Sequence, residues 1–148
     1  MNTRLLRKVQ RVILREPARL CMGGWLSVMS GLTNHEGPSC GTVGCIAGWA
    51  ALLDKPRMRS YRDMAASVNR FDGRSTKEQA KDALGITEEQ SERLFHVGGW
   101  PAKYSEAYKN SDPDFKAGAE AWFRTLNRRR ARIAAARIER FIRSKGNV

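Results

Sequence analysis

The residues best suited to chemistry lie in one short run, Cys40 to Ala50, which combines two cysteines, three glycines and a tryptophan. Small residues at this density let the backbone approach another helix, a metal ion or an anionic ligand. We predict that Thr42, preceded by Gly41, N-caps a helix from Val43 to Leu53. Its first amides and the helix dipole could then hold a phosphate.

The small residues of this run have a simpler interpretation as a packing surface. They recur three and four residues apart on the predicted helix, which forms a flat face that a second helix can approach closely. These residues are Gly44, Ala47, Gly48 and Ala51. The run lacks the Gly-Lys-Ser/Thr ending of a P-loop and the preceding strand of a dinucleotide fingerprint, so it supports neither enzyme class.

Two enzyme hypotheses centre on the cysteines. Cys40 and Cys45, with Cys21, His35 and His96, supply zinc-type donors, but their spacing lacks the close pairs of structural zinc sites. Cys45 in a first helical turn, with His96 as base, could be a nucleophile. We favour reduced cysteines, with Cys21 and Cys45 buried, and expect no metal, no cofactor and no catalytic residue.

Charge is concentrated at the two ends of the chain. Of the formal net charge of +12, residues 1–20 contribute +5 and residues 124–148 contribute +8, so residues 21–123 are almost neutral at −1. Such a distribution favours anionic partners: nucleic acid, nucleotides or acidic protein surfaces.

Candidate ligand-binding residues follow from this pattern. The arginine cluster, which comprises Arg128, Arg129, Arg130 and Arg132, would bind phosphates. Trp100, in a predicted loop, and Trp49 could stack a nucleobase. Together with the helix entry, the predicted site comprises Gly41, Thr42, Trp49, Trp100, Arg128, Arg129, Arg130 and Arg132.

Helical patterns dominate the rest of the chain. Apolar spacing predicts an amphipathic helix over residues 3–15, ended by Glu16-Pro17, and a short helix around residues 21–29. Capping boxes predict helices over 76–84 and 88–96, with Gly85 terminating the first. Further predicted elements are a loop over 30–41, a short helix over 61–71, and helices starting at Trp100-Pro101 and Asp112-Pro113. The last helix is expected to bend or divide at Asn127 to Arg130, where its apolar stripe is interrupted.

These elements predict an all-α fold, a compact single-domain bundle of about six to eight helices, several of them short. The single domain would span residues 1–148, with a basic N-terminal helix over 3–15, a neutral body over 21–123 and a long arginine-rich C-terminal helix over 124–145. Basic residues interrupt every N-terminal apolar run, and no stretch has the length of a membrane span, so we expect a cytoplasmic protein.

A set of short motifs covers most of the chain from residue 17 onward: Met22-x-x-Trp25, the run Cys40 to Ala50, Ala83-Leu84-Gly85-Ile86, Leu94-Phe95, Trp100-Pro101 and Arg137-Ile138-x-x-Phe141-Ile142. On these motifs the chain resembles small, largely uncharacterised helical proteins of bacteria and their phages. The resemblance implies an intracellular protein of a mobile element, with a role in conflict between phage and host, and it implies no activity.

The predicted function is therefore non-enzymatic binding of a phosphate-bearing partner, either nucleic acid or a nucleotide signal that the protein sequesters. The alternatives are a thiol- or zinc-dependent enzyme centred on Cys45 and His96, and an adaptor for an acidic protein. Gly44-x-x-x-Gly48 could also serve a subunit contact, so a homo-oligomer is a further possibility.

Overall fold

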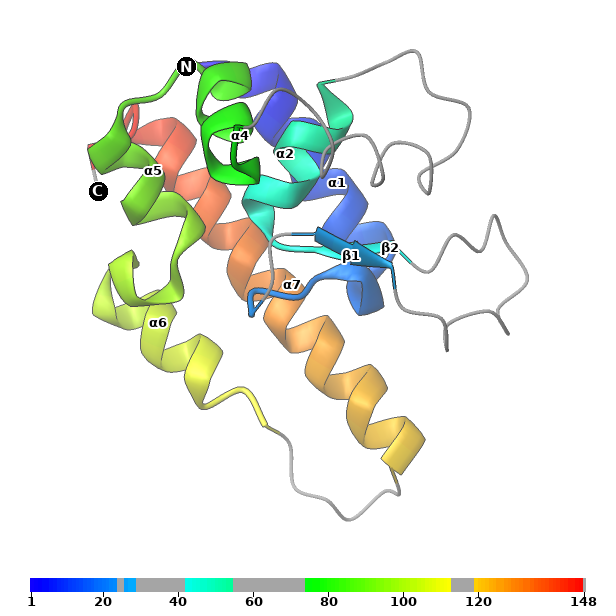
Figure 1. The fold of residues 1–148 in the computed structure, drawn as a ribbon. Helices are drawn as coiled ribbons and strands as arrows, with labels where there is room; N and C mark the ends of the chain where they lie inside the picture. Colours follow the sequence, from blue (N-terminus) through cyan, green and yellow to red (C-terminus); the bar gives the residue numbers. More distant parts are fainter. Residues whose placement is uncertain (24–25, 29–41, 55–73, 113–118, 148) are drawn as a thin grey trace.

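The computed structural model describes residues 1–23, 26–28, 42–54, 74–112 and 119–147. Over these residues the fold is all-α, as predicted, with six α-helices around a hydrophobic core and one short pair of strands (Figure 1). The elements in chain order are α1 (Thr3–Arg15), the 3-10 helix η1 (Pro17–Arg19), β1 (Leu26–Val28), β2 (Thr42–Gly44), α2 (Ile46–Leu53), α4 (Thr76–Leu84), α5 (Glu88–Phe95), the 3-10 helix η2 (Val97–Gly99), α6 (Ala102–Lys109) and α7 (Ala119–Arg143).

Helix α1 has the bounds that its apolar spacing predicts. Leu5, Leu6, Val9 and Ile13 form its buried face. Asn2 caps its start, because the side-chain oxygen accepts from the Leu5 amide at 3.0 Å. The Asn2 backbone amide also donates to the Leu84 carbonyl at 2.6 Å, which ties the start of α1 to the end of α4.

Helices α4 and α5 begin at the two predicted capping boxes. The Ser75 hydroxyl accepts from the Glu78 amide and the Glu78 carboxylate accepts from the Ser75 amide; Thr87 and Gln90 repeat the arrangement. Gly85 ends α4 in the left-handed conformation, with φ of 57°. Local hydrogen bonding therefore sets these boundaries, which is why the sequence predicts them.

The strand pair corrects two sequence predictions. Leu26–Val28 lies in β1, not in a helix, and it pairs antiparallel with β2 in the register Leu26 to Gly44. Because Thr42–Gly44 is extended, α2 cannot start at Val43, and Cys45 takes the N-cap position instead of Thr42. Pairing with a distant segment has outweighed local helix propensity at both places.

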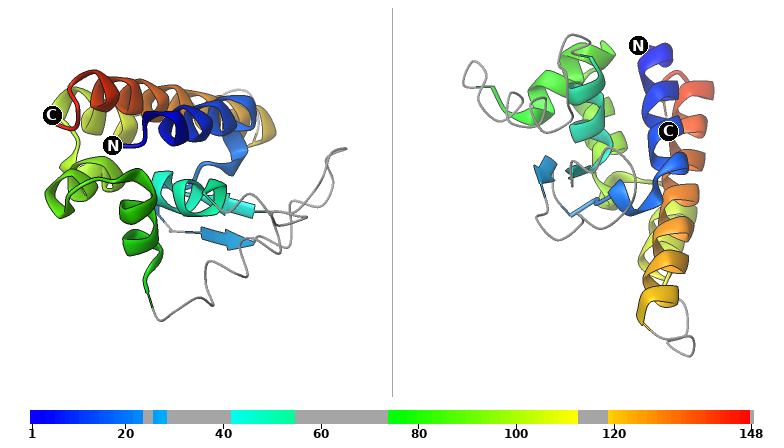
Figure 2. Two further views of the ribbon diagram at one scale, coloured as in Figure 1. Left: turned by 90° about the horizontal axis from the view of Figure 1, so that it is seen from above. Right: turned by 90° about the vertical axis from the view of Figure 1, so that its right-hand side faces the viewer.

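Helix α2 lies at the centre of the molecule. All residues from Ile46 to Leu52 are buried, and α2 packs against α4 and α1. Of the predicted small-residue face, Ala47, Gly48 and Ala51 are in this helix, whereas Gly44 belongs to β2. In Figure 2, α1 and α7 lie side by side in one layer, and α2 and α4 form the layer beneath.

Helix α7 is continuous from Ala119 to Arg143, so the predicted division at Asn127 to Arg130 is wrong. Arginine and alanine are good helix formers and carry the helix through this stretch despite its gap in apolar residues. Other predictions lie outside the described residues: the loop over 30–41, the helix over 61–71, and a start of the last helix at Pro113.

Candidate anion-binding surface

The two basic ends of the chain meet in the antiparallel pair formed by α1 and α7. The Arg7 guanidinium forms a two-pronged ion pair with the Glu139 carboxylate, and the Gln10 amide donates to the Ala135 carbonyl at 3.0 Å. Gln10 lies further along α1 than Arg7, whereas its partner Ala135 lies earlier in α7 than Glu139. The two helices therefore run in opposite directions. The first and last helices of the chain therefore share one layer (Figure 2).

Helix α1 contributes a row of cations to this layer. It contains five basic residues and no acidic one. Arg4, Lys8, Arg11 and Arg15 recur at spacings of three and four, opposite the buried apolar face, so they form one stripe along the helix. Their side chains are exposed, except that Lys8 is half-buried.

Helix α7 contributes a second row beside the first. Ala135 and Glu139 contact α1. Arg128 and Arg132 precede Ala135 by seven and three residues, Arg143 follows Glu139 by four, and all three arginines are exposed. Helical periodicity therefore puts them on the side of α7 that meets α1. We define the cationic face as Arg4, Arg7, Lys8, Arg11 and Arg15 of α1 with Arg128, Arg132 and Arg143 of α7.

Glu139 is the acidic residue inside this face, and it is already neutralised. Its carboxylate accepts from both Arg7 and Arg143, and these bonds hold its pKa below the ordinary value. The neighbouring Glu16 pairs with Arg15 and Arg19 at the end of α1. The face consequently keeps a large excess of positive charge.

Two arginines of α7 belong elsewhere. Arg137 is fully buried, donates to the Arg93 carbonyl at 2.8 Å and stacks over Phe141; burial lowers its pKa to about 10. Arg130 is held on the other side of α7, where it donates to the Ser111 hydroxyl at 3.1 Å and lies over the ring of Tyr108. The sequence-based charge count therefore overstates the surface charge of α7.

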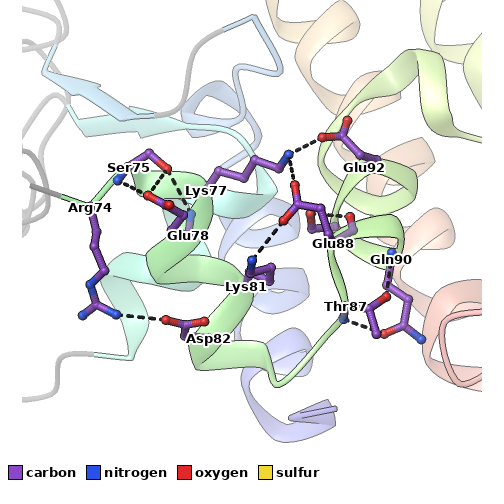
Figure 3. A network of polar contacts seen from close by, with 11 residues as sticks. Arg74, Ser75, Lys77, Glu78, Lys81, Asp82, Thr87, Glu88, Gln90 and Glu92 are labelled. Atoms are coloured by element: carbon purple, nitrogen blue, oxygen red, sulfur yellow. Dashed lines mark hydrogen bonds and ion pairs between the residues drawn. The ribbon is translucent and has the colours of Figure 1, made fainter.

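Acidic residues gather on α4 and α5, in a polar network separate from the cationic face. Lys77 pairs with Glu88 and Glu92, and Lys81 donates to Glu88 at 2.9 Å (Figure 3). The two lysines lower the pKa of Glu88, so it stays ionised at neutral pH. The molecule thus separates an ion-paired acidic side from a cationic side.

Among the grooves of the described surface, a pair bears on binding. One, of about 420 Å³, lies beside α1 and is lined by Lys8, Arg11, Val12, Arg15 and Leu53. The other, of about 860 Å³, is mainly apolar and lies between η1, α6 and α7, where Tyr108, Phe123 and Arg130 line it. Burial raises the pKa of the Tyr108 hydroxyl, which therefore stays protonated at neutral pH.

The structure does not bring the predicted site residues together. Trp49 and Trp100 are buried, with their indole N–H groups donating to the carbonyls of Arg19 at 3.2 Å and Leu94 at 2.9 Å. They are core residues and offer no face for stacking a nucleobase. Thr42 lies in β2, so the helix entry predicted at Thr42 is wrong. Gly41 lies outside the described residues, and phosphate binding by these two residues stays a prediction.

The arginine cluster also divides between two sides of α7. Arg128 and Arg132 lie on the cationic face, Arg129 is exposed elsewhere on the helix, and Arg130 faces α6. The prediction missed Lys8, Arg11 and Arg15 as members of a groove. Their spacing along α1 was visible in the sequence, but the apolar wall formed by Leu53 was not.

The thiol and metal hypotheses find no support in the described part of the chain. Cys45 is 2% exposed, and burial raises its thiol pKa, which disfavours a thiolate nucleophile. His96 is exposed at the end of α5, where it lies 3.4 Å from Glu92. Among the described residues, no group of three or more His, Cys, Asp or Glu side chains is arranged to hold a metal ion.

Comparison with known proteins found no family model, no curated protein and no solved structure that matches this chain. The resemblance to small bacterial and phage proteins therefore stays a prediction. In the described part of the chain, no helix combines the length and the apolar character needed to cross a membrane. The case for a function consequently rests on the charged surfaces.

Proposed function

We propose that this protein binds nucleic acid through the cationic face, by contacts to the phosphate backbone and without catalysis. One observation carries the proposal: the antiparallel pairing of α1 and α7 gathers the charge of both chain ends on one side of one layer. A surface of this kind attracts polyanions and recognises their charge, not their base sequence.

The shape of the charge distribution favours a polymer over a single nucleotide. Cations three or four residues apart on a helix are separated by about 4.5–6 Å along its axis. The α1 stripe repeats this interval from Arg4 to Arg15, and α7 adds a second row beside it. Several successive phosphates of one strand can contact such a face together, whereas one small ligand would engage only a part of it.

The buried tryptophans indicate that contacts to the phosphate backbone matter more here than contacts to the bases. Proteins that hold the bases of a single strand usually stack them on aromatic side chains. Trp49 and Trp100, the predicted candidates, are committed to the core through their indole hydrogen bonds. Contacts from arginine and lysine side chains to the phosphate backbone of the nucleic acid therefore remain as the main source of affinity.

The test is the salt dependence of binding to a fluorescent oligonucleotide, single- or double-stranded. We expect affinity to fall steeply as salt rises. The double variant Arg128→Gln/Arg132→Gln should bind more weakly and reduce the slope of log K against log salt by about 0.7–0.9 for each lost phosphate contact. Lys103→Gln/Lys109→Gln is the matched control, because it removes two exposed cations from α6.

The proposal fails if neither form of nucleic acid binds at low salt, or if the α6 control weakens binding as much as the α7 variant. Binding to an acidic protein with no binding to nucleic acid would favour the adaptor alternative. Turnover of a substrate that disappears in Cys45→Ala would favour the thiol enzyme.

A further inference from the structure

The groove beside α1 differs from the rest of the cationic face because it is concave and has an apolar wall. Among the described residues, Lys8, Arg11 and Arg15 line it from one side of α1, and Val12 and Leu53 contribute apolar side chains. The three cations stand three, four and seven residues apart, so their side chains project from the same side of the helix. Its volume of about 420 Å³ is enough for a phosphate with part of a nucleoside.

The charge of this groove is only partly neutralised. Lys8 has no ion pair with any residue in the described ranges, and the hydrogen bond of Arg11 goes to the uncharged backbone carbonyl of Arg7. Arg15 pairs with Glu16, at 3.1 Å, but Glu16 also pairs with Arg19. The groove therefore holds more positive charge than one phosphodiester can balance.

We propose that this groove binds the terminal phosphate of a nucleic-acid strand. A phosphomonoester carries a charge of about −1.5 to −2 at neutral pH, against −1 for an internal phosphodiester, so it matches a cluster of three cations better. It also has one ester substituent in place of two, and so it can enter a concave site end-on. The last nucleoside would then lie against Val12 and Leu53.

This inference rests on the proposed function, because it makes the groove a distinct part of the surface that binds the strand. The cationic face would supply contacts along the backbone, which any strand can make. The cations of the groove also belong to the cationic face, and the groove would add further affinity for a strand that ends in a phosphate. The two contributions can therefore be separated by changing the end of the strand and leaving its length and sequence unchanged.

The experiment compares oligonucleotides of one sequence that end in 5′-phosphate, 3′-phosphate or hydroxyl groups. We expect at least one phosphorylated form to bind about fivefold more tightly than the hydroxyl form, the effect of roughly one screened ion pair. Lys8→Gln/Arg11→Gln should weaken binding of all three oligonucleotides, because both residues belong to the cationic face, and should also remove this preference. Arg128→Gln/Arg132→Gln should weaken the binding of all three oligonucleotides and leave the ratio of their affinities unchanged. Thermal melting checks that each variant is folded.

The outcomes separate this inference from the proposed function. Equal binding of all three oligonucleotides overturns the inference alone, as does a preference that survives Lys8→Gln/Arg11→Gln. Absence of binding to every oligonucleotide overturns both. A nucleoside 5′-monophosphate that binds as tightly as the phosphorylated strand would also overturn it, because the ligand would then be a free nucleotide.

Discussion

At the scale of single residues, Cys45 shows how the structure changes the meaning of a reactive side chain. The thiol lies at the start of α2, as a nucleophilic cysteine often does, but it is buried. Its sulfur accepts from the Gly48 amide at 3.5 Å, and burial raises its pKa in spite of that bond. The side chain therefore caps a helix in the core and is a poor nucleophile.

We predict that iodoacetamide at pH 8 alkylates exposed Cys21 much faster than Cys45 in the folded protein. The raised pKa leaves little Cys45 thiolate at this pH, and burial excludes the reagent. Tandem mass spectrometry over a time course would assign the modified positions. Labelling in denaturant is the control, in which both cysteines should react. Equal rates in the folded protein would contradict the structural role of Cys45 and would support the hypothesis that it is a catalytic nucleophile.

At the scale of elements, the continuity of α7 matters most. The helix passes through Asn127 to Arg130 without interruption, so Arg128 and Arg132 keep a fixed spacing from Ala135, which contacts α1. A helix that divided at this point would leave the orientation of these arginines free. Continuous α-helix is thus what makes the second cationic row regular.

We predict that Arg129→Gly lowers the free energy of unfolding by about 1 kcal/mol relative to Arg129→Ala. Arg129 is exposed inside the helix, so the two variants lose the same charge and differ mainly in backbone freedom. Urea denaturation followed by circular dichroism would measure the difference. Equal stability of the two variants would indicate that the helix is broken there.

At the scale of the whole molecule, one ion-paired cluster joins the two ends of the chain. Glu139 accepts from Arg7 of α1 and from Arg143 of its own helix, and both contacts lower its pKa. A carboxylate with a lowered pKa stabilises the folded state above its ordinary pKa of 4.5, and this stabilisation is lost as pH falls through the folded-state value. The contact that assembles the cationic face is therefore sensitive to acid.

We predict that Glu139→Gln is less stable than the wild-type protein at pH 7 and that the difference shrinks as the pH drops below 4.5. Protonation of Glu139 makes the wild type resemble the variant, because both side chains are then uncharged. Melting temperatures measured from pH 7 to pH 3 would test this. A difference that stays constant with pH would show that the ion pair contributes nothing to the pairing of α1 and α7.

Elements whose boundaries depend on near neighbours could be predicted from the sequence. The bounds of α1, the capping boxes of α4 and α5 and the left-handed Gly85 follow from apolar spacing and from hydrogen bonds within one turn. The separation of charge into two basic ends is likewise a property of the chain. These features were predicted because their causes lie within a few residues of one another.

Features that depend on contacts between distant segments could not be predicted in this way and required the three-dimensional structure. Pairing of β1 with β2 moved the start of α2, core packing took Trp49, Trp100 and Arg137 away from the surface, and the antiparallel contact of α1 with α7 merged two basic ends into one face. In each case the free energy of burial or pairing comes from residues far apart in the chain. A local sequence pattern does not show which distant segment will supply this free energy.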